Sequence, residues 1–173
     1  MSVTARVGRR PSIADLLREN SRPLFSFELY PPRNEEETQR AWFTVRRLEQ
    51  LEPDFVSVTY GANGSTRDRT IKITKEIAET TTLRTMAHLT AASQSRAQLR
   101  RVIGSYAAAG IRHILAIRGD MPGGPLVPWE PHPEGLANAT ELVAMVRELG
   151  DFCIGVAAFP DLHPQTRDAD LDA

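Results

Sequence analysis

The sequence predicts an α/β fold in which helices cover a parallel sheet. Four short apolar runs recur at intervals of about 30 residues, the length of one strand, one helix and their two loops. Apolar stripes with helical spacing lie between these runs. Because strands and helices alternate strictly and the strands are apolar almost throughout, a parallel sheet is favoured over an antiparallel one.

The first elements are bounded by start and stop signals. Ser12 and Asp15 have the spacing of a capping box and open a short helix before the first strand. That strand is expected over residues 24–30, where a proline pair ends it. Asn34 is expected to cap the next helix, because three glutamates fill its first turn and suit the helix dipole.

The later elements repeat this pattern. Further strands are expected over residues 54–60, 84–90, 113–118 and 152–159. Ser65 and Asp68 again have capping-box spacing, so the loop after the second strand is expected to end at a helix N-terminus. Gly110 and Gly150 are expected to end two later helices. The sequence therefore holds about five βα units.

Two closures of such a sheet fit the pattern. Five strands can form an open, doubly wound sheet, or they can be the first five strands of an eight-stranded barrel. Barrels of that kind need about 250 residues, so on the second interpretation the chain is incomplete. We expect a flexible arm at residues 1–11 and one domain at residues 12–173.

Composition limits the possible partners. Lys and Arg total 21 against 22 for Asp and Glu, so the net charge of -1 does not favour nucleic acid or a membrane surface. The single cysteine, Cys153, lies in an apolar run and is expected to be a core residue. No apolar stretch reaches the roughly 18 residues that span a bilayer. Since no apolar segment follows the N-terminal arginines, we expect a cytoplasmic protein.

Each of the four recurring runs ends on a residue suited to chemistry: Glu28, Thr59, His88 and Asp120. The carboxyl ends of parallel strands meet at one edge of a sheet, where α/β enzymes build their active sites. Aromatic neighbours are expected to desolvate Glu28 and favour the protonated form that a general acid needs. A structural hydrogen bond at the strand end is the alternative. The spacing indicates an enzyme.

The other candidates also have structural alternatives. Asp120 fits a loop carboxylate paired with Arg118 as well as it fits a catalytic group, and Arg118 itself suits a phosphate or carboxylate ligand. His88 lies within an apolar strand, where a satisfied core histidine is the more frequent case, and His163 is equally ambiguous. The histidines show no close helical pairing, so a metal site is disfavoured. Gly-x-Ser-x-Gly and Gly-x-Gly-x-x-Gly motifs are both absent.

Five motifs resemble those of the methylenetetrahydrofolate reductase family, in the family's order and spacing. They read FELYPPR, FVSVTYGANGSTRDRT, AHLT, GIRHILAIRGD and VAAFPDLHP, at residues 27–33, 55–70, 87–90, 110–120 and 156–164. The resemblance covers about residues 24–172. It implies a (β/α)8 barrel of the TIM type, of which this chain holds about five βα units, with FAD at the carboxyl ends of the strands.

The resemblance also implies a reaction. The family reduces 5,10-methylenetetrahydrofolate to 5-methyltetrahydrofolate, with NADH or NADPH giving hydride to the flavin before folate binds in the same place. Glu28 matches the general acid, which would protonate the bridging amine of the folate and open its five-membered ring to an iminium ion. Asp120 matches the acid beside flavin and folate, where it would tune the flavin and contact the substrate.

Other matched positions imply cofactor contacts. These are Thr59, Tyr60, Ala62, His88, Arg118, Gly119, Asp120, His163 and Asp172. Phe159 stands where many family members have a tyrosine against the flavin, so the ring face is kept and a hydroxyl is lost. No metal is implied.

Three hypotheses remain at this point. The first is a partial reductase that is inactive or poorly folded without its remaining strands. The second is a short protein that keeps part of the cofactor site and pairs with another chain, as in a homo-oligomer. The third, an unrelated five-stranded α/β enzyme, would have to ignore all five motifs.

Overall fold

The computed structural model describes residues 10–19, 21–60, 64–124 and 126–158, and in them every predicted strand and helix is found. The strands are β1 (Ser26–Leu29), β2 (Phe55–Val58), β3 (Thr85–Thr90), β4 (His113–Ile117) and β5 (Cys153–Val156). The helices are α1 (Ile13–Glu19), α2 (Glu35–Glu49), α3 (Gly64–Thr80), α4 (Arg96–Ala108) and α5 (Ala139–Leu149). β1, β2 and β5 are shorter than predicted at both ends, whereas β3 only begins one residue later and β4 only ends one residue earlier than predicted.

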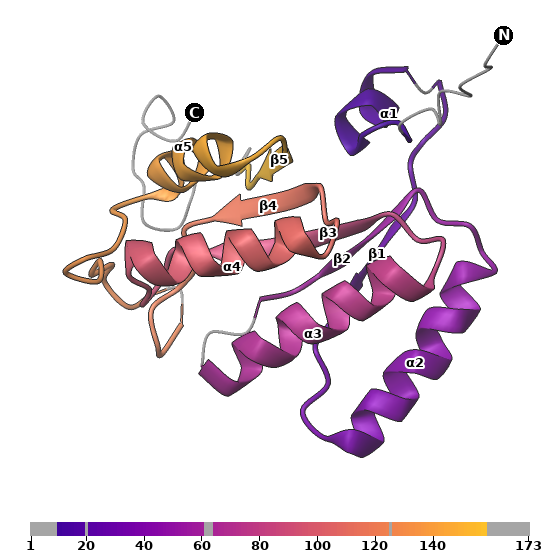
Figure 1. Cartoon of the computed structure of the whole chain (residues 1–173), viewed down its shortest axis with the longest axis horizontal. Coiled ribbons are helices and arrows are strands. Elements are labelled where there is room, and N and C mark those ends of the chain that lie inside the picture. The colour runs from indigo at the N-terminus through magenta and orange to yellow at the C-terminus, as the bar shows by residue number, and fades with distance from the viewer. Residues whose placement is uncertain (1–9, 20, 61–63, 125, 159–173) are drawn as a thin grey trace, which may run out of the picture.

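The order of the strands decides between the two predicted closures. All neighbours pair in parallel in the order β1-β2-β3-β4-β5, so every crossover steps in the same direction. Right-handed crossovers that never reverse place their helices on one face, whereas a doubly wound sheet reverses once. Figure 1 shows α2, α3, α4 and α5 following one another along the sheet. The fold is therefore that of a partial TIM-type barrel.

Alternation along the strands separates two faces of the sheet. The outer face packs on the helices and contributes Val56, Val58, Ala87, Leu89, Ile114 and Ala116 to the core. The intervening residues form the inner face, which includes Glu28, Ser57, His88 and Leu115. Since paired residues share a face, the register Glu28↔Ser57 and His88↔Leu115 sets these side chains beside one another.

The larger core cluster lies under α4 and α5. As its spacing predicts, α4 buries Leu99, Val102, Ile103 and Tyr106 against β3 and β4. Burial of each such side chain stabilises the fold by about 1.5–3 kcal/mol. Cys153 departs from its prediction, because it is only half-buried. Among the described residues β5 pairs with β4 alone, and no described helix covers the inner face on which Cys153 lies.

Local signals begin or end most of the helices at the predicted residues. Ser12 and Asp15 exchange hydrogen bonds, with Asp15 N–H donating to Ser12 Oγ at 3.1 Å and Ser12 N–H donating to Asp15 Oδ2 at 2.9 Å. Asn34 Oδ1 accepts from Glu37 N–H at 2.9 Å. Gly110 follows α4 with a φ of 74°, which favours glycine. α3 begins at Gly64, two residues before Thr66, the first helical residue that a Ser65 cap predicts.

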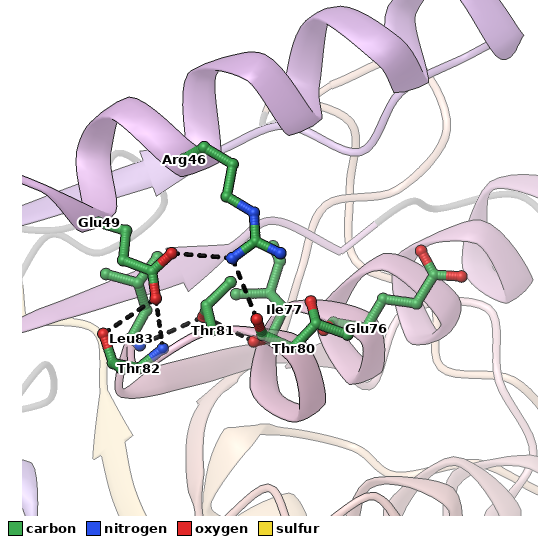
Figure 2. A network of polar contacts seen from close by, with 8 residues as sticks. All are labelled: Arg46, Glu49, Glu76, Ile77, Thr80, Thr81, Thr82 and Leu83. Atoms are coloured by element: carbon green, nitrogen blue, oxygen red, sulfur yellow. Dashed lines mark hydrogen bonds and ion pairs between the residues drawn. The ribbon is translucent and has the colours of Figure 1, made fainter.

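Polar contacts join the C-terminal ends of α2 and α3 (Figure 2). Arg46 Nη1 donates to Glu49 Oε2 at 2.9 Å and to the Thr80 carbonyl at 3.1 Å. Glu49 Oε1 accepts from the Thr82 N–H at 2.7 Å and from its hydroxyl at 3.0 Å. These hydrogen bonds, that of the Thr82 N–H first, lower the pKa of Glu49. The network fixes the two helices to one another near the amino end of β3.

Candidate active site

The register of the sheet brings two of the predicted catalytic-edge residues together. Glu28 lies on β1 beside Ser57 of β2, and Ser57 pairs with Met86, two residues before His88 on β3. Glu28 and His88 consequently face one another across β2, with Glu28 Oε2 3.7 Å from His88 Nε2. At this separation the two groups interact through charge and have no direct hydrogen bond.

The expected apolar surroundings of Glu28 are not found. Its side chain is 47% exposed, and the aromatic residues around it in the sequence, Phe25, Phe27 and Tyr30, are themselves exposed. The physical reason is the position of β1, which pairs with β2 alone and turns Glu28 to the face that the helices do not cover. Aromatic neighbours in the sequence desolvate a carboxyl group only if the fold packs them around it.

His88 is buried and incompletely satisfied. Its side chain is 9% exposed, and Nε2 has no hydrogen-bond partner among the described residues. Burial lowers the pKa of His88, and the nearby charge of Glu28 opposes this shift. The ring is therefore neutral near pH 7, with one nitrogen that a ligand on the inner face can satisfy.

Tyr60 is held by a residue that the sequence did not single out. Its hydroxyl donates to Gln94 Oε1 at 3.2 Å, and Gln94 Nε2 donates to the Thr90 carbonyl at 2.6 Å. Gln94 is fully buried. It therefore connects the loop after β2 with the end of β3. Thr59 is positioned nearby, because its N–H donates to the Leu29 carbonyl at 2.9 Å. The sequence signal that could have indicated Gln94 is its position, since it is a long polar residue that follows three small residues and precedes Ser95, the cap of α4.

The chain leaves β4 through a tightly packed glycine. Gly119 has a φ of 80°, and a Cβ built there would lie 2.8 Å from Thr90 Cβ. The preceding Arg118 carbonyl accepts the N–H groups of Ala91 at 3.1 Å and Ala92 at 3.0 Å. This close approach requires glycine and sets Asp120, which is exposed, just beyond the sheet.

Arg118 has an aromatic partner that the sequence did not indicate. Its guanidinium lies over the Trp129 ring, 4.9 Å from the centroid, and among the described residues it makes no ion pair with Asp120. The structural alternative of an Arg118–Asp120 pair is therefore wrong. Trp129 Nε1 is buried without a partner in the described part of the chain. Arg118 Nε donates to the Gly119 carbonyl at 3.4 Å, and the stacking restricts the guanidinium while leaving its two Nη groups to bind an anion.

Four predicted cofactor contacts lie outside the described residues: Ala62, Phe159, His163 and Asp172. The described ranges contain no group of three or more His, Cys, Asp or Glu side chains arranged for a metal ion. No described helix is both long and apolar enough to cross a membrane.

Comparison with known proteins identifies the family. The family described as methylenetetrahydrofolate reductase matches residues 12–173. The chain belongs to the methylenetetrahydrofolate reductase family. The 5,10-methylenetetrahydrofolate reductases of Pectobacterium carotovorum and Salmonella typhimurium are 46% and 45% identical to it. Each alignment covers 85% of this chain and 47% of the relative.

A plant relative is more distant. The protein named methylenetetrahydrofolate reductase (NADH) 1 of Arabidopsis thaliana is 35% identical over 156 residues, which are 88% of this chain and 26% of the relative. The chain thus spans about half the length of the bacterial reductases that it matches. The TIM-barrel fold of the methylenetetrahydrofolate reductase family agrees with the unreversed strand order.

One observation among the described residues fits a flavin of the kind that the methylenetetrahydrofolate reductase family generally uses. His88 Nε2 is a buried polar atom that lacks a hydrogen-bond partner in this part of the chain.

Proposed function

We propose that this chain contributes the acid and part of the flavin site to the reduction of 5,10-methylenetetrahydrofolate to 5-methyltetrahydrofolate, with NADH or NADPH as reductant. The observation that carries the proposal is the pairing of Glu28 with the unsatisfied His88 at 3.7 Å, on the face and edge where a barrel holds its substrate. Membership of the family supports the substrate class.

In this proposal Glu28 holds the proton that the reaction requires. The folate amine takes that proton as the five-membered ring opens, and the exposed carboxylate regains one from solvent. The neutral His88 ring faces Glu28 and adds no second positive charge beside the developing iminium ion. Asp120 is exposed at the neighbouring strand end, where its carboxylate would favour a cationic intermediate.

The flavin, when bound, accepts a hydride from the nicotinamide and supplies it to the folate. Six described residues would hold it: Thr59, Tyr60, His88, Arg118, Gly119 and Asp120. Arg118, stacked on Trp129, offers guanidinium donors to anionic groups of the cofactor. Contacts from Ala62, Phe159, His163 and Asp172 stay predictions, as do the cytoplasmic location and the flexible arm.

A second candidate function is favoured by the open sheet. β1 and β5 each pair on one side only, and Phe25, Tyr30 and Val156 at these edges are exposed. An inner face between two open sheet edges suits a chain that keeps part of the cofactor site and is completed by further strands. Under this alternative the isolated chain is inactive or depends on a partner.

The visible absorption spectrum of the purified chain, recorded after incubation with FAD and gel filtration, tests the proposal. Co-eluting flavin that NADH or NADPH then bleaches is the expected result for a working cofactor site. Protein that elutes without flavin would contradict flavin binding by these five strands alone and would support the partner-dependent alternative.

The substitution Glu28→Gln tests the role of Glu28. It is made in a protein that reduces folate, which is either this chain alone or this chain completed by further strands. Loss of a general acid should reduce folate reduction at least about 100-fold while leaving flavin reduction by the nicotinamide intact. Glu36→Gln removes the same charge from the exposed first turn of α2 and serves as the control. Equal turnover by Glu28→Gln and the control would exclude Glu28 as the acid.

A further inference from the structure

A cavity opens at the amino end of the sheet, away from the proposed active site. It has a volume of about 260 Å³ and is lined by residues that precede or begin α1, β3, β4 and β5. We call it the amino-end cavity. α1 lies at this end of the strands in Figure 1. Its volume is many times what one ordered water requires, so a small ligand can enter.

The charged side chains that line the amino-end cavity are arginines. Arg10, Arg84 and Arg112 come from three separate segments, and no acidic side chain lines the cavity among the described residues. Ser12 and Thr85 also line the cavity, but their hydroxyls already donate to Asp15 Oδ2 at 2.7 Å and to the Leu83 carbonyl at 3.3 Å. Three guanidinium groups around one space form a positive field that attracts anions.

The carboxylate of Asp54, whose charge acts on Arg84, already has other hydrogen-bond partners. Asp54 accepts two hydrogen bonds from Arg22, at 2.6 and 3.0 Å, and a third from the Phe25 N–H at 2.8 Å. Burial lowers the pKa of Arg84, and repulsion from Arg10 lowers it further. The other neighbouring carboxylate, Asp15, accepts from the Ser12 hydroxyl at 2.7 Å and pairs with Arg18 at 3.4 Å, so neither Asp54 nor Asp15 lines the cavity.

The arginines also keep hydrogen-bond donors in reserve. Arg84 donates one bond, from Nη1 to the Asp54 carbonyl at 2.5 Å, and its buried Nε has no partner among the described residues. Arg10 donates to the Thr82 carbonyl at 2.9 Å. Since a guanidinium carries five N–H donors, one such bond leaves most of the donors of each group for a ligand. The backbone carbonyls of Asp54 and Thr82 therefore use only a small part of the donor capacity of these arginines.

We propose that the amino-end cavity binds a phosphate group, either inorganic phosphate or the phosphate of a monoester. Guanidinium groups that approach from three segments match a tetrahedral dianion, whose oxygens accept from several directions. The site is separate from the carboxyl edge where folate reduction is proposed. Its occupant would join the arm before α1 to β3 and β4, and so stabilise the amino end of the barrel.

Calorimetric titration of the full chain with inorganic phosphate, at constant ionic strength, tests this inference. Arg112→Gln removes an exposed guanidinium and should weaken phosphate binding about tenfold, the loss of one charge-assisted hydrogen bond. Arg101→Gln makes the same change on the exposed side of α4, where Arg101 Nε contacts only its own helix, and should bind as wild type does.

The outcomes separate this site from the proposed active site. Weakening by Arg112→Gln and by Arg84→Met, with no change in Arg118→Gln, supports the amino-end cavity. Weakening by Arg118→Gln alone would place the phosphate at the carboxyl edge and overturn the inference, and so would absence of millimolar binding by the wild type. Glycerol 3-phosphate titrated in parallel distinguishes the two sources: tighter binding than phosphate indicates an ester, and weaker binding indicates the free ion.

Discussion

At the scale of single residues, His88 shows how one side chain can serve packing and chemistry together. Its carbonyl accepts from the buried Tyr106 hydroxyl at 3.4 Å, while Nε2 faces Glu28 without a hydrogen bond. The two interpretations of His88 from the sequence, core residue and functional residue, both describe part of what the structure shows. The ring is buried like a core histidine and unsatisfied like a ligand-binding one.

Titration of His88, followed by NMR of its ring, provides a first prediction. The pKa should lie below the ordinary value of 6.5, because burial disfavours the charged ring. Glu28→Gln should lower that pKa further, since the Glu28 charge favours the protonated ring. Folding stability linked to His88 should be present above pH 6.5 and decline as the pH falls below it, where the unfolded chain binds the proton first. A pKa above 6.5 would contradict the burial of His88.

Gly119→Ala is expected to destabilise the chain by about 2 kcal/mol, because the new Cβ meets Thr90 at a positive φ. Gly104→Ala is the matched control, since nothing lies within 4 Å of a Cβ in the middle of α4. That change should stabilise the chain by up to about 1 kcal/mol through helix propensity. Urea unfolding measures both. Equal effects of the two substitutions would contradict the close packing at Gly119.

At the scale of elements, the loops that follow the strands are fastened to one another. Gln94 bridges the loop after β2 and the end of β3, and the Arg96 N–H donates to the Glu134 carbonyl at 2.8 Å in the loop after β4. The buried Gln94 and the backbone bond between Arg96 and Glu134 together hold the loops in one arrangement. They would position Tyr60 and Arg118 before any cofactor binds.

Gln94→Leu should therefore cost about 2–3 kcal/mol of unfolding free energy, since it removes two hydrogen bonds and leaves buried groups unpaired. Tyr60→Phe removes only one of these bonds and should cost about 1 kcal/mol. In the double variant the cost of Tyr60→Phe should largely disappear, because its partner is already gone. Additive costs, measured by denaturant unfolding, would show that the two side chains are not coupled.

At the scale of the whole molecule, the helices cover the outer face and the described chain leaves the inner face and two sheet edges open. Exposed edges favour pairing with further strands, either those of a completed barrel or those of another copy. Glu28 is exposed for the same reason. The proposed chemistry at Glu28 and the association of the chain are thus connected through one surface.

Association through β1 is tested by Phe25→Lys. Phe25 precedes β1 and is 65% exposed, and a lysine at a sheet edge disfavours strand pairing. We expect the average molecular mass of the wild-type protein, measured by light scattering, to increase with protein concentration. Phe25→Lys should reduce that increase. Phe43→Lys on α2, where Phe43 is 67% exposed, is the control for loss of an exposed aromatic ring. A wild-type monomer at all concentrations would contradict association.

Local signals in the sequence predicted the order of the elements and most of their ends. Ser12, Asn34 and Gly110 act on their own backbone or on residues a few positions away, so their roles can be predicted without knowing the fold. The period of the βα unit placed Glu28 and His88 in the carboxyl-terminal halves of β1 and β3, and Thr59 and Asp120 shortly after β2 and β4. The motif resemblance added the family, which the comparisons confirmed.

Tertiary structure alone decided which side chains meet and which are covered. The Glu28–His88 approach depends on the register across β2, and the burial of Gln94 and of Trp129 Nε1 depends on loops that converge from separate units. The exposure of Glu28 and the half-burial of Cys153 follow from edge positions in the sheet. Sequence periodicity determines the face on which a residue lies, but solvation depends on the neighbours that long-range packing brings to that face.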